Sequence, residues 1–324
     1  MSTYENLHGR RVNVVSSNPS NPKEGEVWYN STLGLLKGYV LSPATISSGG
    51  NMTLARAQLG GCGASQSSGV IFGGEAPSVP SITAKTEEYD GTSWSNGGDA
   101  PTGKSDMVSV GTQTAALWGG GSPTSSASYL YNGTSWTGTG AMTFSNRDVY
   151  GGGAGTSTAG LSIGGFISPG NYSAAMQVFD GSSWTNLPQT FPSAPKTNTF
   201  STAGIQTACI SAGPGTDSLE WNGSTWTATN NLATPLNSAV HSGTVSGSVL
   251  MGGGPGYKTT IQTWDGTNWS NSPLTLSSGR SQAAEAGTAT SSLIFGGADG
   301  TPDHTNATEE FNAAAVATKT LTTG

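Results

Sequence analysis

The six residues YDGTSW at positions 89–94 recur in outline four more times along the chain. The related stretches are YNGTSW at 131–136, FDGSSW at 179–184, WNGSTW at 221–226 and WDGTNW at 264–269. Their tryptophans are Trp94, Trp136, Trp184, Trp226 and Trp269, spaced 42, 48, 42 and 43 residues apart. A period in the forties is typical of repeat proteins in which each repeat is one supersecondary unit.

Each of these stretches predicts a β-hairpin, because Asp-Gly or Asn-Gly supplies the positive-φ residues that a tight turn needs. The leading aromatic residue and the trailing Trp are expected on the same face of the hairpin. A single hairpin cannot bury such a pair, so the tryptophans are predicted to pack between repeats rather than to bind a ligand. The leading positions are Tyr89, Tyr131, Phe179, Trp221, Trp264 and, in a sixth unit, Phe311.

A short apolar strand running into small residues precedes each hairpin, and a segment rich in Gly, Ala and Ser precedes that strand. Four strands per unit follow, with the small-residue strand innermost, where sheets converge on a crowded axis. Six such units predict an all-β fold, a six-bladed β-propeller of four-stranded antiparallel blades. The apolar strands are VIFGG (70–74), AALWGGG (115–121), LSIGG (161–165), ACISAG (208–213), VLMGGG (249–254) and LIFGG (293–297).

The order of a double Gly, an aromatic residue with Asp or Asn, and then Trp resembles the Kelch repeat over about residues 51–324. Two units depart from it: the fourth has Ala212-Gly213, and the sixth has Val316 where Trp is expected. The blades read as contiguous, so how the ring closes stays open. A hairpin predicted within 25–40 could supply the closure, and residues 42–51 are interpreted as a linker.

The sequence predicts two parts that meet within this linker: an N-terminal arm, residues 1–45, and a propeller, residues 46–324. The stretch NPSNPKEGEVWYNSTLGLLK in the arm resembles an element of bacteriophage virion proteins, especially tail-associated proteins of phages that infect cyanobacteria. TEEYDGTSW, and TEEFN near the end, resemble repeats of Kelch-like proteins in such phages. The resemblance implies a virion protein on an extracellular particle, attached to tail or capsid proteins through residues 1–45.

Composition argues against several function classes. The net charge of −7 argues against binding to nucleic acid, and no stretch is long and apolar enough for membrane insertion. Cys62 and Cys209 show no metal or disulfide spacing, and three scattered histidines form no metal motif. Asp90 lies four residues before Trp94, whereas the Asp box of sialidases needs five. We therefore expect no enzyme activity and no cofactor or metal.

A basic residue stands about eleven residues after each Trp, where the inner strand begins. In a propeller this column would form a ring near the axis, which could hold a carboxylate, a sulfate or an acidic sugar. The alternative is that each residue pairs with a local acid, such as Asp106, Asp148 or Glu285, or caps carbonyls between blades. The column consists of Arg56, Lys104, Arg147, Lys196 and Arg280, and Asn237 breaks it in the fifth unit.

Because the strands of a unit alternate in direction, the start of the first strand lies at the same end as the loop between the second and third strands. These basic residues are therefore expected on the same face as those loops. These loops vary in length and sequence, and a variable face on a rigid scaffold is where binding is expected. Tyr172, Tyr257 and His304 are the side chains there best suited to contact a sugar or a protein.

The sequence thus predicts a non-enzymatic, tail-fibre-like virion protein whose propeller face binds a host-surface glycan or protein. Two alternatives remain open. One is a purely architectural protein that decorates or cements the particle, and the other is a glycan-cleaving propeller enzyme, which would need paired carboxylates or a Tyr and acid pair in one cleft. The oligomeric state, including a homo-oligomer, is not fixed by the sequence.

Overall fold

The computed structural model describes residues 12–77, 81–144, 152–167, 171–192, 200–300 and 304–321. The strands form seven four-stranded sheets. No helix within the described ranges is long and apolar enough to cross a membrane. The chain divides into two compact units, one made of Met1–Thr45 with Ala313–Gly324 and the other of Ile46–Asn312.

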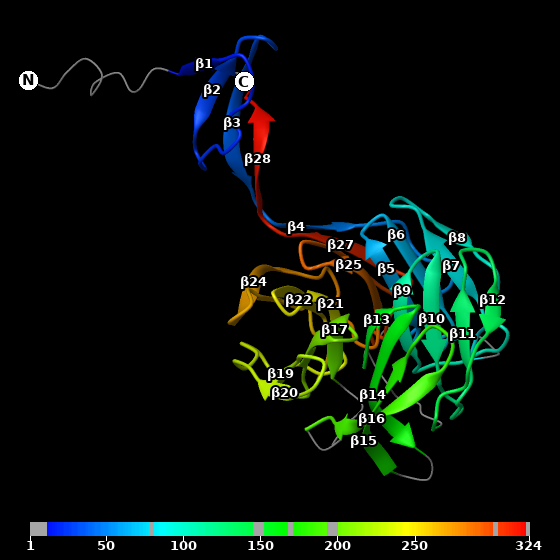
Figure 1. Cartoon of the computed structure of the whole chain (residues 1–324). Coiled ribbons are helices and arrows are strands. Elements are labelled where there is room, and N and C mark those ends of the chain that lie inside the picture. The colour runs from blue at the N-terminus through cyan, green and yellow to red at the C-terminus, as the bar shows by residue number, and fades with distance from the viewer. Residues whose placement is uncertain are drawn as a thin grey trace, which may run out of the picture. The chain divides into compact units, whose positions relative to one another are not determined.

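Six of the seven sheets belong to the unit Ile46–Asn312, and the first five are each contiguous in sequence (Figure 1). The first sheet contains β5 (Gly60–Ser65), β6 (Ser68–Phe72), β7 (Thr86–Tyr89) and β8 (Trp94–Asn96). The second contains β9 (Val108–Thr112), β10 (Ala115–Gly119), β11 (Ser128–Tyr131) and β12 (Trp136–Gly138). The third contains β13 (Gly153–Thr156), β14 (Ala159–Ile167), β15 (Asn171–Phe179) and β16 (Trp184–Thr190). The fourth sheet contains β17 (Ser201–Ile205), β18 (Ala208–Ala212), β19 (Ser218–Trp221) and β20 (Trp226–Ala228). The fifth contains β21 (Val240–Thr244), β22 (Gly247–Met251), β23 (Thr260–Trp264) and β24 (Trp269–Thr275). The sixth contains β25 (Ala284–Thr288), β26 (Ser291–Phe295), β27 (Thr308–Asn312) and β4 (Thr45–Ser48).

The innermost strands of these six sheets contact one another in a closed circle. β5 contacts β9, each later inner strand contacts the next, and β25 returns to β5. The apolar core lies between neighbouring sheets, as where Ile71 and Tyr89 of the first sheet pack with Leu293 and Phe295 of the sixth. This arrangement is a β-propeller, as the repeat predicts.

The sheet count differs from the sequence-based prediction, because the chain has seven four-stranded sheets rather than six. The additional sheet lies in the other unit and consists of β1 (Asn13–Val15), β2 (Val27–Asn30), β3 (Leu35–Ser42) and β28 (Ala315–Thr320). β1 runs parallel to β2, whereas β28 pairs antiparallel with β3 (Figure 1). Residues 313–324 therefore belong with the N-terminal unit, and not with the propeller as the predicted range 46–324 had it.

The N-terminal unit contains the hairpin predicted within residues 25–40, formed by β2 and β3. Its large buried side chain among the described residues is Trp28, which is fully inaccessible to solvent. Asn18 holds the loop before the hairpin against it, because its side-chain oxygen accepts hydrogen bonds from Trp28 Nε1 at 3.1 Å and Asn30 Nδ2 at 3.0 Å. Val316, which the repeat assigns to the sixth blade, instead pairs with Leu41 in this sheet.

The repeated aromatic pair has the predicted geometry. In each of the five hairpins the leading aromatic residue is the direct cross-strand partner of the Trp, with ring centroids 4.9–5.4 Å apart. The Asp or Asn fixes the turn: Asp90 Oδ1 accepts hydrogen bonds from the backbone N–H of Thr92 and Ser93. These bonds favour the charged carboxylate and lower the pKa of Asp90.

Each Trp also bonds to the preceding sheet through its indole N–H. Trp94 Nε1 donates to Thr308 Oγ1 at 2.9 Å, and Trp136 Nε1 donates to Thr86 Oγ1 at 3.0 Å. The acceptor is a hydroxyl at the first residue of the third strand in four cases, including Ser128 for Trp184 and Ser218 for Trp269. Trp226 instead donates to the sulfur of Met176. The tryptophans therefore lock adjacent sheets together.

The ring closes through β4, which the sequence analysis interprets as part of a linker. β4 supplies the outer strand of the sixth sheet beside β27 (Figure 1). The backbone N–H of Gly49 donates to the Thr308 carbonyl, and that of Met52 donates to the Asn306 carbonyl, each at 2.9 Å. Thr45–Ser48 thus takes the place that a Trp strand fills in the other sheets.

The Trp94–Thr308 bond spans the junction between the first and last sheets, so we expect Thr308→Val to weaken ring closure. Val keeps the shape of the buried Thr308 but leaves the indole N–H without an acceptor, at an expected cost of about 1–3 kcal/mol in the free energy of unfolding. Urea titration measures the loss. Thr227→Val on the exposed outer strand β20 is the matched control, with an expected change within about 0.5 kcal/mol. Equal stability of the two variants would contradict a stabilising role for the Trp94–Thr308 hydrogen bond.

Candidate functional site

The loop face is the end of the propeller where the inner strands begin and where the second and third strands are joined. Arg56, just before β5, donates from Nη1 to the carbonyl oxygens of Gly73 at 2.9 Å and Lys85 at 2.8 Å. These two carbonyls stand at either end of the loop between β6 and β7. Lys104 likewise donates from Nζ to the Pro123 carbonyl at 2.6 Å. The basic residues and the variable loops therefore share one face.

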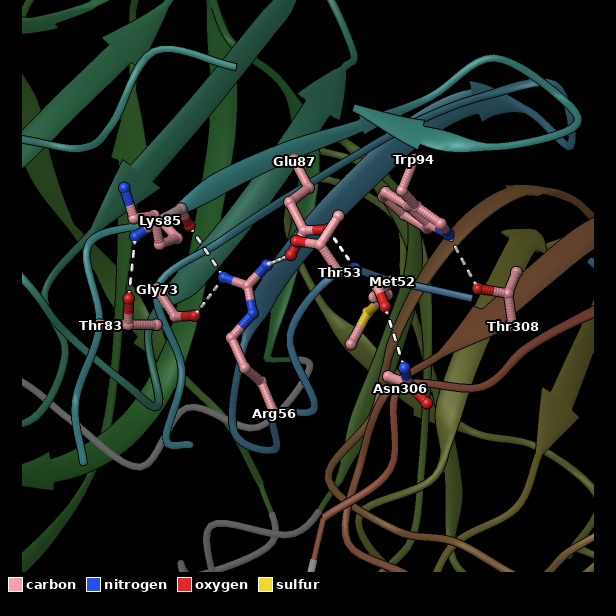
Figure 2. Close-up of polar contacts among 10 residues, drawn as sticks. All are labelled: Met52, Thr53, Arg56, Gly73, Thr83, Lys85, Glu87, Trp94, Asn306 and Thr308. Atoms are coloured by element: carbon pink, nitrogen blue, oxygen red, sulfur yellow. Dashed lines mark hydrogen bonds and ion pairs between the residues drawn. The ribbon is translucent and has the colours of Figure 1, made fainter. Parts of the chain in front are cut away.

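Arg56 is held in a fully buried ion pair. Its Nη2 lies 2.6 Å from Glu87 Oε1, and the two side chains are 0% and 1% exposed. Figure 2 shows the guanidinium between Glu87 and the carbonyls of Gly73 and Lys85. Burial lowers the pKa of Arg56, and the negative charge of Glu87 opposes that shift. Glu87 Oε2 also accepts the backbone N–H of Thr53, so the pair links the loops of the first sheet.

Arg280 repeats this arrangement in the sixth sheet. Its Nη2 pairs with Glu309, and its Nη1 donates to the Ala307 carbonyl at 2.9 Å. Glu309 in turn accepts the backbone N–H of Ser277 at 2.9 Å. Both side chains of the pair are nearly inaccessible to solvent, at 1% and 4% exposed.

The fifth sheet replaces the ion pair with neutral residues. The isolated bridges align Asn237 with Ala57 and Ser281, so the position of Arg56 and Arg280 is occupied by Leu236. The sequence-based assignment of Asn237 to this position was therefore wrong by one residue. Leu236 is buried, and Gln262 on β23 takes the place of Glu87, accepting the backbone N–H of Thr234.

The described members of the basic column do not form a ligand ring. Arg56 and Arg280 are buried in ion pairs, and Lys104 bonds to a loop carbonyl, with its pKa lowered by burial. Arg147 and Lys196 lie outside the described residues. The acids that pair with the arginines are Glu87 and Glu309, not Asp106 or Glu285. The sequence signal for them is the first Glu of TEEY and TEEF, which the sequence analysis uses only as a family resemblance.

The central cavity is lined instead by the inner strands. At the loop face it has a volume of about 50 Å³, and Gln58, Asp106, Ser238 and Gln282 are among its lining residues. Deeper along the axis a second cavity of about 170 Å³ is lined by all six inner strands, and Glu285 lines both. Among the described lining residues the acids are Asp106 and Glu285, and there is no Lys or Arg.

Four non-glycine residues with left-handed backbone line part of the mouth of this cavity. Gln58, Asp106, Ser238 and Gln282 have φ between 48° and 56°. Their backbone groups form a chain of bonds from sheet to sheet: Gln282 N–H donates to Ser238, Gln58 to Gln282, and Asp106 to Gln58, at 2.9–3.1 Å. This left-handed conformation is uncommon for side-chain-bearing residues, and here it coincides with inter-sheet bonds. The backbone of this part of the mouth is thereby held in place from the second sheet through the first and sixth to the fifth.

Glu285 is the acid inside the cavity. Its Oε2 accepts the backbone N–H of His241 on the neighbouring inner strand β21. Burial raises the pKa of Glu285 to about 8, although the His241 N–H bond acts in the opposite direction. The His241 ring contacts Ser201 and Ser248, and burial lowers its pKa to about 4, so it is neutral at pH 7.

The predicted recognition residues are spread over three sheets. Tyr172 is 37% exposed on β15 and packs edge-on against Phe166. Tyr257 is 44% exposed in the loop before β23, where its ring lies against Gly300 of the sixth sheet. His304 is half-buried in the loop before β27. The structure thus brings the loops of Tyr257 and the sixth sheet together but places Tyr172 on the third sheet.

Comparison with known proteins bears on the fold. No family model and no curated protein matches the chain. Among solved structures, one titled "Structure of YjhT" superimposes with a TM-score of 0.61 at 12% identity, covering 82% of this chain and 99% of that one. The likeness shows a propeller fold. At 12% identity the likeness assigns no activity to this chain. In the described part of the chain, no group of three or more His, Cys, Asp and Glu residues is placed to hold a metal ion.

The fifth sheet supplies a test of the buried ion pair in the first. We expect Arg56→Leu alone, and Glu87→Gln alone, to lower the free energy of unfolding by about 3–5 kcal/mol, because each leaves a buried charged or polar partner unpaired. The double variant copies Leu236 and Gln262 and is expected to recover most of that loss. Chemical denaturation of the four proteins gives the coupling energy. Additive losses in the double variant would contradict the pairing.

Proposed function

We propose that this protein is a non-enzymatic, tail-fibre-like virion component that presents the loop face of its propeller to a host-surface glycan or protein. The observation that carries the proposal is the axial opening of the loop face. Polar residues of four neighbouring sheets line part of that opening, and the exposed Tyr257 lies in a loop of one of these sheets. Concave polar sites beside an exposed aromatic residue suit sugar and protein recognition. The virion origin rests on the sequence resemblance alone.

The distribution of exposed apolar side chains supports attachment through the N-terminal unit. Of the nine large hydrophobic side chains exposed in the described residues, six belong to this unit. They are Val12, Val14, Tyr29, Leu33, Leu35 and Leu41. A small unit with many exposed apolar side chains favours contact with another protein. In the proposed function this unit docks on tail or capsid proteins.

The charge of the opening selects the class of ligand. Because Asp106 lines the cavity at the loop face and no Lys or Arg is among its described lining residues, the site favours neutral or positively charged groups over acidic sugars. This replaces the acidic ligand expected from the basic column. In this proposal a neutral hexose or an amino sugar is the preferred glycan.

The test is binding of the full chain to a glycan array, followed by affinity measurement on the best neutral or amino-sugar ligand. We expect Tyr257→Ala and Gln282→Ala each to weaken binding about tenfold, equivalent to about 1.4 kcal/mol. Thr92→Ala, in a tight turn remote in sequence from the loop face, is the control and should bind as the unchanged protein does. Binding that depends on sialylated or sulfated ligands would contradict the proposal.

Two further results would decide between this function and its rivals. Mass spectrometry of the bound glycan tests for cleavage, and release of a shorter sugar would establish an enzyme instead. Cryo-EM of particles that carry the chain tests the architectural alternative. A loop face covered by neighbouring subunits would overturn recognition, whereas an uncovered loop face with a buried N-terminal unit would support it.

A further inference from the structure

The inner strands meet at a polar junction between the fifth and sixth sheets. Along each inner strand, alternate side chains point towards the preceding and the following sheet. Glu285 of β25 points back to β21, as its bond to His241 shows. Ala286, the next residue, packs forward against Ile71 and Tyr89 of the first sheet. By the same alternation Ser242, which follows His241 on β21, points forward to β25. Glu285 and Ser242 thus converge on one junction.

Ser242 has an unsatisfied hydroxyl at this junction. The residue is 4% exposed, and its Oγ has no hydrogen-bond partner among the described residues. Ser242 and Glu285 both line the cavity of about 170 Å³. A buried hydroxyl without a hydrogen-bond partner lowers the stability of the folded state, so a bound group that interacts with the hydroxyl stabilises the fold. The carboxylate also has capacity to spare, since its described hydrogen bond uses only Oε2.

We propose that the axial cavity binds an alkali cation, held by the carboxylate of Glu285 and the hydroxyl of Ser242 between the fifth and sixth sheets. Carboxylate, hydroxyl and carbonyl oxygens are the ligands of hard cations. The inner strands are sheet edges, so their backbone carbonyls add oxygens along the cavity wall.

The charge balance selects a monovalent ion. Glu285 supplies one negative charge in the deep cavity, and the described residues offer no cluster of acids such as Ca²⁺ sites use. The other titratable groups that line the cavities are His241 and Cys62, with Asp106 at the mouth.

The experiment measures thermal unfolding of the full chain in sodium, potassium, calcium and choline chloride at equal ionic strength and at one pH. We expect sodium or potassium to raise Tm above the choline value by about 3 °C at roughly ten times the Kd. Calcium should give no greater rise than the alkali ions. No difference between alkali and choline salts, or an effect of calcium alone, would overturn the proposal.

Two variants locate the ion. Glu285→Gln keeps the shape of the side chain and should abolish the alkali-dependent rise, and Ser242→Ala should weaken it. Glu310→Gln, on β27 and absent from the cavity lining, is the control and should keep it. Line broadening of ²³Na in the presence of the folded protein gives a second measurement that does not depend on unfolding. An alkali effect that persists in Glu285→Gln would contradict the assignment.

Discussion

The hydrogen bond from the indole of each of the five hairpin tryptophans to the preceding sheet is the interaction that holds the propeller together. A four-stranded sheet of small residues cannot bury its own aromatic pair, so each sheet requires a neighbour. Because the sheets form a ring, the requirement is met everywhere only if the last sheet also meets the first. Trp94 and Thr308 make that contact, and β4 completes the sheet that carries Thr308. The hairpin aromatic residues thus stabilise the packing between sheets, whereas the loops between the second and third strands differ in length and sequence from sheet to sheet.

The same ring determines how charge is distributed. With few charged side chains in the sequence, two of the arginines are used inside the protein, where Glu87 and Glu309 compensate them. The fifth sheet does without such a pair by using Leu236 and Gln262. The axis consequently carries acids rather than bases in its described part, which changes the class of ligand that the opening can accept.

Much of the fold could be predicted from the sequence because the signals are local. The turn residues and the paired aromatic side chains identify each hairpin, and the period identifies the ring. The closing strand Thr45–Ser48 could not be recognised, since it is a short polar stretch with no Trp. Likewise the pairing of β28 with β3 joins segments that are far apart in the sequence, and no local pattern encodes it. The basic column is visible in the sequence, but the acids that pair with Arg56 and Arg280 lie about thirty residues later, and no local pattern shows that they are in contact.

In the proposed function the loop face is the surface that contacts a partner. Hydrogen–deuterium exchange of the full chain, alone and with its best array ligand, is the direct test. Slower exchange on binding is predicted for the amides of the loop-face segments 56–59, 252–259 and 280–284, with no change in the tight turns at 90–93 and 265–268. Protection confined to the tight turns, or to the N-terminal unit, would contradict it.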